Sequence, residues 1–125
     1  RVTMDWSFRN DQPIYSQLTQ RLTEAIVSGI YAPGEKLPSV RELALEAGVN
    51  PNTVQRALTE LEREGLVFSQ RTAGRFVTEN ENMIVNAKLR IADERVSEFL
   101  RSMKTLGCGR QEIISLIEGA KEDEE

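Results

Sequence analysis

Apolar side chains between positions 13 and 28 recur every three or four residues, which is the spacing of one face of a helix. Pro13 suits the first helical position because its φ is preset, and Gly29 can end the helix in a left-handed conformation. Residues 31–36 include a proline and a glycine and predict a turn-rich connector. The pattern therefore predicts an amphipathic helix followed by a loop.

Two shorter helices are predicted next, separated by a tight turn. Ser39 and Glu42 have capping-box spacing, in which each side chain accepts a hydrogen bond from the other residue's backbone amide. This helix should end at Gly48, and Asn50 is a good N-cap for the next helix, which should run to about Glu64. Two short helices joined by a glycine turn are typical of a helix-turn-helix.

The second of these helices has an apolar side and a polar, basic side. The side expected to be buried carries Val54, Ala57, Leu58 and Leu61. The opposite side carries Asn52, Arg56, Thr59 and Arg63, flanked by Thr53 and Gln55. Acidic residues gather towards the C-terminal end, so the N-terminal half is expected to approach DNA.

Two β-prone runs, 66–70 and 75–78, flank a short loop ending in Gly74 and predict a hairpin, or wing. Arg71 and Arg75 lie at or beside its tip, where an arginine can enter a minor groove or bind phosphate. The alternative is a hairpin whose arginines are only solvated. With the preceding helices, the hairpin completes the pattern of a winged helix-turn-helix over residues 13–78.

From about residue 82 a long helix is predicted, because its apolar positions alternate spacings of four and three. Residues 107–109, Gly-Cys-Gly, end it, and residues 111–120 predict a shorter apolar helix. A lone two-helix hairpin cannot bury so much apolar surface, so a homodimer is expected. Its predicted interface comprises Val85, Leu89, Ala92, Val96, Phe99, Met103, Leu106, Ile113 and Ile117. The alternative is that both helices fold back on the N-terminal domain.

Composition adds limits to this picture. The 125 residues carry a net charge of −4 and 39% hydrophobic residues, with no membrane-length apolar run. No signal-peptide pattern is present, and a single cysteine, Cys108, cannot form an internal disulfide, which favours the cytoplasm. The expected fold is mainly α with a small β-hairpin. It has an N-terminal arm (1–12), a winged helix-turn-helix (13–78) and a helical dimerisation unit with an acidic tail (79–125).

Three motifs resemble the GntR superfamily of bacterial transcription regulators: LPSVRELA, GVNPNTVQRALTELEREGLV and the hairpin ending GRFV. The preceding PIYSQL and the short helical C-terminus are similar to the YtrA-like subgroup, whose members have a two-helix dimerisation unit in place of a large ligand-binding domain. The motifs most specific to the family lie within about residues 13–78. It implies a DNA-binding repressor and points to control of a nearby transporter operon.

The resemblance implies DNA contacts at Arg41, Asn50, Asn52, Thr53, Gln55, Arg71 and Thr72. Arg41 is the first candidate for base reading, because arginine pairs bidentately with guanine. Its alternative is an ion pair with Glu42 or Glu46. Face geometry alone adds three expected phosphate contacts, Arg56, Arg63 and Arg75.

Two of the implied contacts depart from the family pattern. Many relatives have arginine where Gln55 stands, and glutamine would read adenine rather than guanine. Many also have glycine where Thr72 stands, and a Cβ there limits close approach of the wing to the minor-groove floor. A Cβ at this position therefore disfavours base reading by the wing.

The primary functional hypothesis is a dimeric, sequence-specific repressor of an inverted-repeat operator in double-stranded DNA. A winged-helix protein-interaction module would agree with the net negative charge. An enzyme is not expected, because the chain has no histidine, one cysteine, no metal-ligand cluster and no phosphate-binding glycine loop. No cofactor or metal is therefore predicted. The roughly 45 residues after the wing are too few to enclose a drug-sized pocket, so any effector would use the dimer interface or a cleft between domains.

Overall fold

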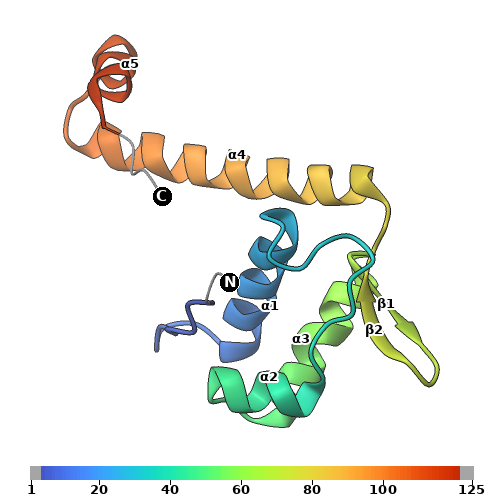
Figure 1. Ribbon diagram of the computed structural model, residues 1–125. Coiled ribbons are helices and arrows are strands. Elements are labelled where there is room, and N and C mark those ends of the chain that lie inside the picture. Colours follow the sequence, from blue (N-terminus) through green and yellow to red (C-terminus); the bar gives the residue numbers. More distant parts are fainter. Residues whose placement is uncertain (1–3, 122–125) are drawn as a thin grey trace. The chain divides into compact units, whose positions relative to one another are not determined.

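The computed structural model describes residues 4–121 (Figure 1). Within this range the chain forms five helices and one antiparallel hairpin, in the order α1 (Ile14–Val27), α2 (Val40–Ala47), α3 (Pro51–Arg63), β1 (Val67–Gln70), β2 (Gly74–Val77), α4 (Glu81–Thr105) and α5 (Arg110–Gly119). The expected fold class, a mainly α chain with a winged helix-turn-helix before a helical C-terminal region, is confirmed.

The chain divides into two compact units, one ending at Lys88 and the other beginning at Leu89. The start of α4 belongs to the first unit, where Ala87 is buried in the core and Ile84 packs against it. No helix in the described part of the chain is both long and apolar enough to cross a bilayer.

The helix ends follow the local sequence signals closely. Both halves of the capping box form at the start of α2: the Glu42 amide donates to Ser39 Oγ (3.1 Å) and the Ser39 amide to Glu42 Oε1 (2.8 Å). Gly48 ends α2 with φ 69°, in the left-handed region. The predicted position of Pro13 was wrong by one residue, because Pro13 is the N-cap of α1 and the first helical residue is Ile14. The extended ψ of Pro13, 139°, cannot continue a helix.

The core of the first unit lies where α1, α2 and α3 pack together. Side chains from all three helices are at most 1% exposed, including Leu22, Leu43 and Leu58. The four α3 positions expected to be buried are buried, namely Val54, Ala57, Leu58 and Leu61. Burial of each large aliphatic side chain stabilises the unit by about 1.5–3 kcal/mol.

The connector before α2 does more than turn the chain. Gly34 and Leu37 donate backbone hydrogen bonds to the carbonyls of Val77 and Arg75, and the Val77 amide donates back to Glu35. Residues 34–37 therefore run beside β2 as a short third edge of the hairpin. The sequence predicted only a turn here, because these partners lie some 40 residues away and leave no local signal.

The N-terminal arm packs on the body of the first unit. Trp6 and Phe8 are half-buried against the core. The Gln17 amide clasps the arm, since its Oε1 accepts from the Arg9 amide (2.7 Å) and its Nε2 donates to the Arg9 carbonyl (2.8 Å). Arg21 donates to two more backbone carbonyls of the arm.

The capping box generates the first prediction. Ser39→Ala should lower the free energy of unfolding by about 1 kcal/mol, because the amide at the third position of α2 loses its partner. Urea unfolding followed by circular dichroism measures the change. Ser16→Ala, at an exposed position of α1, is the matched control and should stay within about 0.5 kcal/mol of wild type. Equal losses in the two variants would contradict a stabilising role for the cap.

Candidate nucleic-acid interface

The start of α3 presents several polar side chains to solvent. Asn50, Asn52 and Gln55 are exposed and Thr53 is half-buried. Asn50 caps the helix by accepting from the Asn52 amide (2.7 Å). This end of the helix also carries the positive end of the helix dipole, which favours an anion such as phosphate. The geometry suits a helix that enters a groove by its N-terminus.

Arg41 is exposed on α2, and each of its expected local partners accepts a hydrogen bond from another residue. Glu42 accepts the Ser39 amide in the capping box, and this hydrogen bonding holds the pKa of its carboxyl below the ordinary value. Glu46 Oε2 accepts a hydrogen bond from Nε1 of Trp6, a residue of the N-terminal arm (2.9 Å). Among the residues that the structure describes, Arg41 forms no salt bridge. Its guanidinium is therefore available to a ligand.

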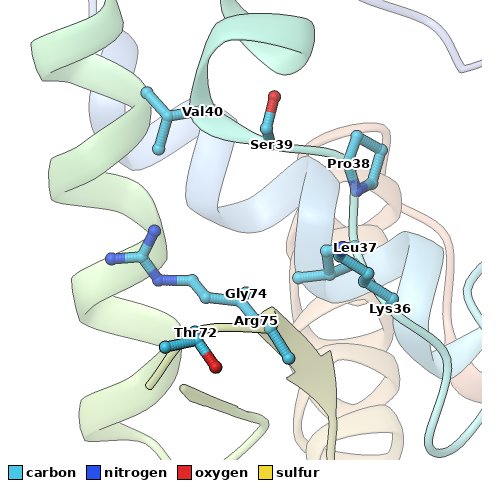
Figure 2. A pocket seen from close by; sticks show the side chains of 9 residues that line it. Lys36, Leu37, Pro38, Ser39, Val40, Thr72, Gly74 and Arg75 are labelled. Carbon is cyan, nitrogen blue, oxygen red and sulfur yellow. The ribbon is translucent and has the colours of Figure 1, made fainter. Parts of the chain in front are cut away.

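The wing loop and the start of α2 face each other across a pocket of about 320 Å³ lined by residues 36–40 and 72–75 (Figure 2). Lys36 and Arg75 are its charged lining residues, and both are positive. Arg71 and Thr72 are exposed in the loop between β1 and β2. The fold thus brings the wing loop beside the segment that leads into Arg41.

A carboxylate of α3 fixes the wing to the helix. Glu62 Oε1 accepts from Arg75 Nε (2.5 Å) and from Ser69 Oγ (2.9 Å), and Ser69 and Arg75 are paired across the hairpin. The side chains of Arg75 and Glu62 are only 21% and 31% exposed. The hydrogen bond from Arg75, followed by that from Ser69, lowers the pKa of Glu62. Figure 2 shows the Arg75 side chain reaching across towards α3.

The three arginines expected at phosphate on face geometry have different surroundings. Arg75 pairs with Glu62, and Arg63 pairs with Glu60. Arg56 is exposed and lies over the ring of Tyr15. Sequence reasoning missed Glu62, Ser69 and Tyr15 as parts of this surface, because only the hairpin register and the packing of α1 on α3 bring them there.

The predicted dimer stripe is largely exposed in the single chain. Val96 is 54% exposed, Phe99 41% and Leu106 74%. Val85, Leu89, Ala92 and Ile117 are also exposed, and Met103 is half-buried. Ile113 differs, because at 6% exposure it is already covered by its own chain.

No group of three or more acidic, cysteine or histidine side chains that could hold a metal ion occurs between residues 4 and 121. The exposed side chains at the start of α3 and in the wing loop include amides, hydroxyls and guanidinium groups. Such groups donate hydrogen bonds to phosphates and base edges.

Comparison with known proteins gives matches along most of the chain. The model of the gntR family of bacterial regulatory proteins matches residues 14–77. The chain is 38% identical over 118 residues to the uncharacterized HTH-type transcriptional regulator YhcF of Bacillus subtilis, covering 94% of this chain and 95% of YhcF. It is 42% identical over 93 residues to the HTH-type transcriptional repressor YtrA of Bacillus subtilis, covering 74% and 72% of the two chains.

Solved structures give the same result. A GntR family transcriptional regulator from Listeria monocytogenes superposes with a TM-score of 0.84 at 36% identity, over 91% of this chain and all of that one. The DNA-binding domain of AraR, solved in complex with operator ORX1, superposes with a TM-score of 0.52 at 31% identity, over 54% of this chain and 81% of that one.

The hydrogen bonds that Glu62 accepts from Arg75 and Ser69 generate a prediction about pH. Because the folded pKa of Glu62 lies below its ordinary value of 4.5, its stabilisation is complete above that value and is lost as pH falls through the folded pKa. Glu62→Gln should lower the free energy of unfolding at neutral pH by about 1 kcal/mol. Its thermal midpoint should also fall less than that of wild type between about pH 6 and about pH 3.

Circular dichroism melts at each pH measure this difference. Glu98→Gln, at an exposed position of α4, is the control and should keep the wild-type pH profile. If the thermal midpoint of Glu62→Gln changed with pH in parallel with that of wild type, the Glu62 carboxylate would contribute nothing to stability.

Proposed function

The chain belongs to the GntR family of bacterial regulatory proteins, and we propose that it is a dimeric repressor that binds an inverted-repeat operator. Regulators of this family bind DNA and are not enzymes, and the resemblance seen in the sequence motifs to YtrA-like members is confirmed. In the proposed complex, two copies of α3 enter successive major grooves on one side of the duplex. Repression follows from occlusion of a promoter.

The observations that carry the proposal are the exposed Arg41 of α2, which forms no salt bridge among the described residues, and the exposed polar side chains at the start of α3. Arg41 pairs with guanine O6 and N7, and Asn52 and Gln55 supply hydrogen bonds to adenine or to phosphate. Asn50 and Thr53 bring the helix end against the backbone. The related AraR domain was solved in complex with an operator, which supports operator binding by this family.

The wing makes a second, smaller contact in this proposal. Arg71 is exposed at the loop and is the residue expected to enter the minor groove or to bind its phosphates. Thr72 positions the loop beside it, with a Cβ that keeps the backbone from the groove floor. Arg75 acts mainly by holding the wing to α3 through Glu62.

The dimer rests on the apolar stripe of α4 and α5. Monomeric proteins rarely expose large continuous apolar patches, so the exposed Leu89, Val96 and Phe99 need a partner surface. A second copy supplies the same apolar stripe. The apolar positions of α4 alternate spacings of four and three residues, which is the pattern of helices that pair in a coiled coil. Two heads joined in this way would read the two halves of a symmetric site.

Two finer points complete the proposal. The name of the related YtrA supports repression rather than activation. Control of a neighbouring transporter operon rests on the YtrA-like resemblance alone, and transcript levels of genes flanking the regulator, measured with and without it, test that point.

Selection of bound duplexes from a random DNA pool tests the core of the proposal. The enriched sequences should form an inverted repeat, and the affinity for the selected duplex should fall steeply with salt because phosphate contacts release counterions. Arg41→Ala should weaken binding to this duplex by about 5- to 150-fold, the equivalent of about 1–3 kcal/mol.

Fluorescence anisotropy titration measures the affinities. Arg101→Ala, which removes an exposed arginine of α4, is the matched control and should leave affinity within about twofold. Wild-type affinity in the Arg41→Ala variant would mean that this residue reads no base. A protein that enriches no sequence would refute operator binding altogether.

Sedimentation equilibrium tests the dimer. The wild-type protein should be dimeric at micromolar concentration, and Phe99→Glu should shift it to monomer because a charge cannot be buried unpaired in an apolar interface. Ser97→Glu introduces the same charge on α4 outside the stripe and should remain dimeric. A wild-type monomer, or equal behaviour of the two variants, would rule out this interface.

A further inference from the structure

Arg56 lies on the exposed side of α3, directly after Gln55, with its guanidinium over an aromatic ring of another helix. Its Cζ is 3.5 Å from the centroid of the Tyr15 ring on α1. At this separation the guanidinium must lie nearly flat on the ring, because an edge-on approach would push a nitrogen into the ring face. The stack fixes the plane of an otherwise flexible side chain.

The stack leaves the hydrogen-bond donors of Arg56 free. Arg56 donates no hydrogen bond to any other described residue, although its charge interacts with the Glu60 carboxylate, whereas Arg63 and Arg75 are paired with carboxylates of α3. In a guanidinium the N–H bonds lie in the plane of the group. A flat stack therefore directs them outwards along the ring rather than into the protein.

Tyr15 is a suitable platform because it lies on a helix that packs against α3. The ring is half-buried, and neighbouring residues of α1, Leu18 and Leu22, are fully buried in the core shared with α3. The segment of α1 that carries the ring is thus packed against the helix that carries Arg56. The stack also holds the Arg56 guanidinium on the side of α3 that faces α1.

We propose that Tyr15 is a positioning residue, which holds the Arg56 guanidinium flat so that its N–H edge meets a backbone phosphate of bound DNA. The inference rests on the proposed operator binding and adds to it a residue of α1, outside the helix-turn-helix itself. A preformed guanidinium loses less side-chain freedom on binding than a free one, so the contact contributes more to affinity. Because a phosphate is the target, the contribution carries no base preference.

A double-mutant cycle on the selected operator duplex tests the proposal, with affinities measured over a salt series. Arg56→Ala should weaken binding and reduce the slope of log affinity against log salt by about 1, the loss of one phosphate contact. Tyr15→Leu should weaken binding by about two- to fivefold, the effect of one cation–π contact at an exposed site. Added to Arg56→Ala, Tyr15→Leu should cause no further loss.

Tyr15→Phe is the matched control, because it keeps the ring and removes the hydroxyl, and its affinity should remain near that of wild type. Tyr15→Met also fills the space of the ring without being aromatic. Of Tyr15→Leu and Tyr15→Met, the variant that retains the wild-type thermal midpoint is combined with Arg56→Ala in the double-mutant cycle. Equal losses with and without Arg56, or a loss in Tyr15→Phe as large as in Tyr15→Leu, would overturn the proposal. These outcomes differ from a failure of operator binding, in which the wild-type protein itself shows no salt-dependent binding.

Discussion

Burial of one side of α3 is the constraint on which the rest of the first unit depends. Val54 and Leu61 are completely buried, and Ala57 and Leu58 lie between them on the same side. Because successive residues of a helix are about 100° apart, a buried set with this spacing fixes the direction of every other side chain on the helix. The polar N-terminal half faces outwards for this reason. The same apolar contacts that hold the unit together therefore aim the residues that would contact DNA.

The net charge of the chain does not show which arginines are paired within the protein. The net charge is −4, yet carboxylates near the arginines of the first unit are used within the protein. Glu60 and Glu62 pair with arginines, Glu42 closes a helix cap and Glu46 bonds a tryptophan. Arg41 and Arg56 form no salt bridge among the described residues, so both guanidinium groups can bind a ligand.

The second unit has the opposite balance between burial and exposure. Helix α4 is 25 residues long. Among the described residues of α4 that belong to the second unit, only Ile91 is buried. The exposed apolar stripe would be costly to leave in water, which is why a second copy is the economical partner. In this arrangement the C-terminal helices would supply symmetry while the first unit supplies recognition.

The sequence by itself determined the parts whose partners are close along the chain. The Ser39–Glu42 cap joins residues three positions apart, and the Gly48 turn and the Asn50 cap are equally local. The apolar periodicity of α3 and α4 could likewise be read directly, because helical spacing needs no knowledge of the partner surface. These signals were sufficient for the winged helix-turn-helix and for most of the candidate reading residues.

Only the tertiary structure decided which of those residues are free to bind. The hydrogen bond from Trp6 that occupies Glu46 spans 40 positions, and the bond from Arg75 to Glu62 spans 13. The stack of Arg56 on Tyr15 likewise joins two separate helices. Such pairs form when the core brings distant segments together, and neither residue of a pair carries a local signal for the other. The sequence thus supplied the candidate arginines, and folding set their separate roles, because a guanidinium that has a carboxylate partner in the protein is less available to phosphate.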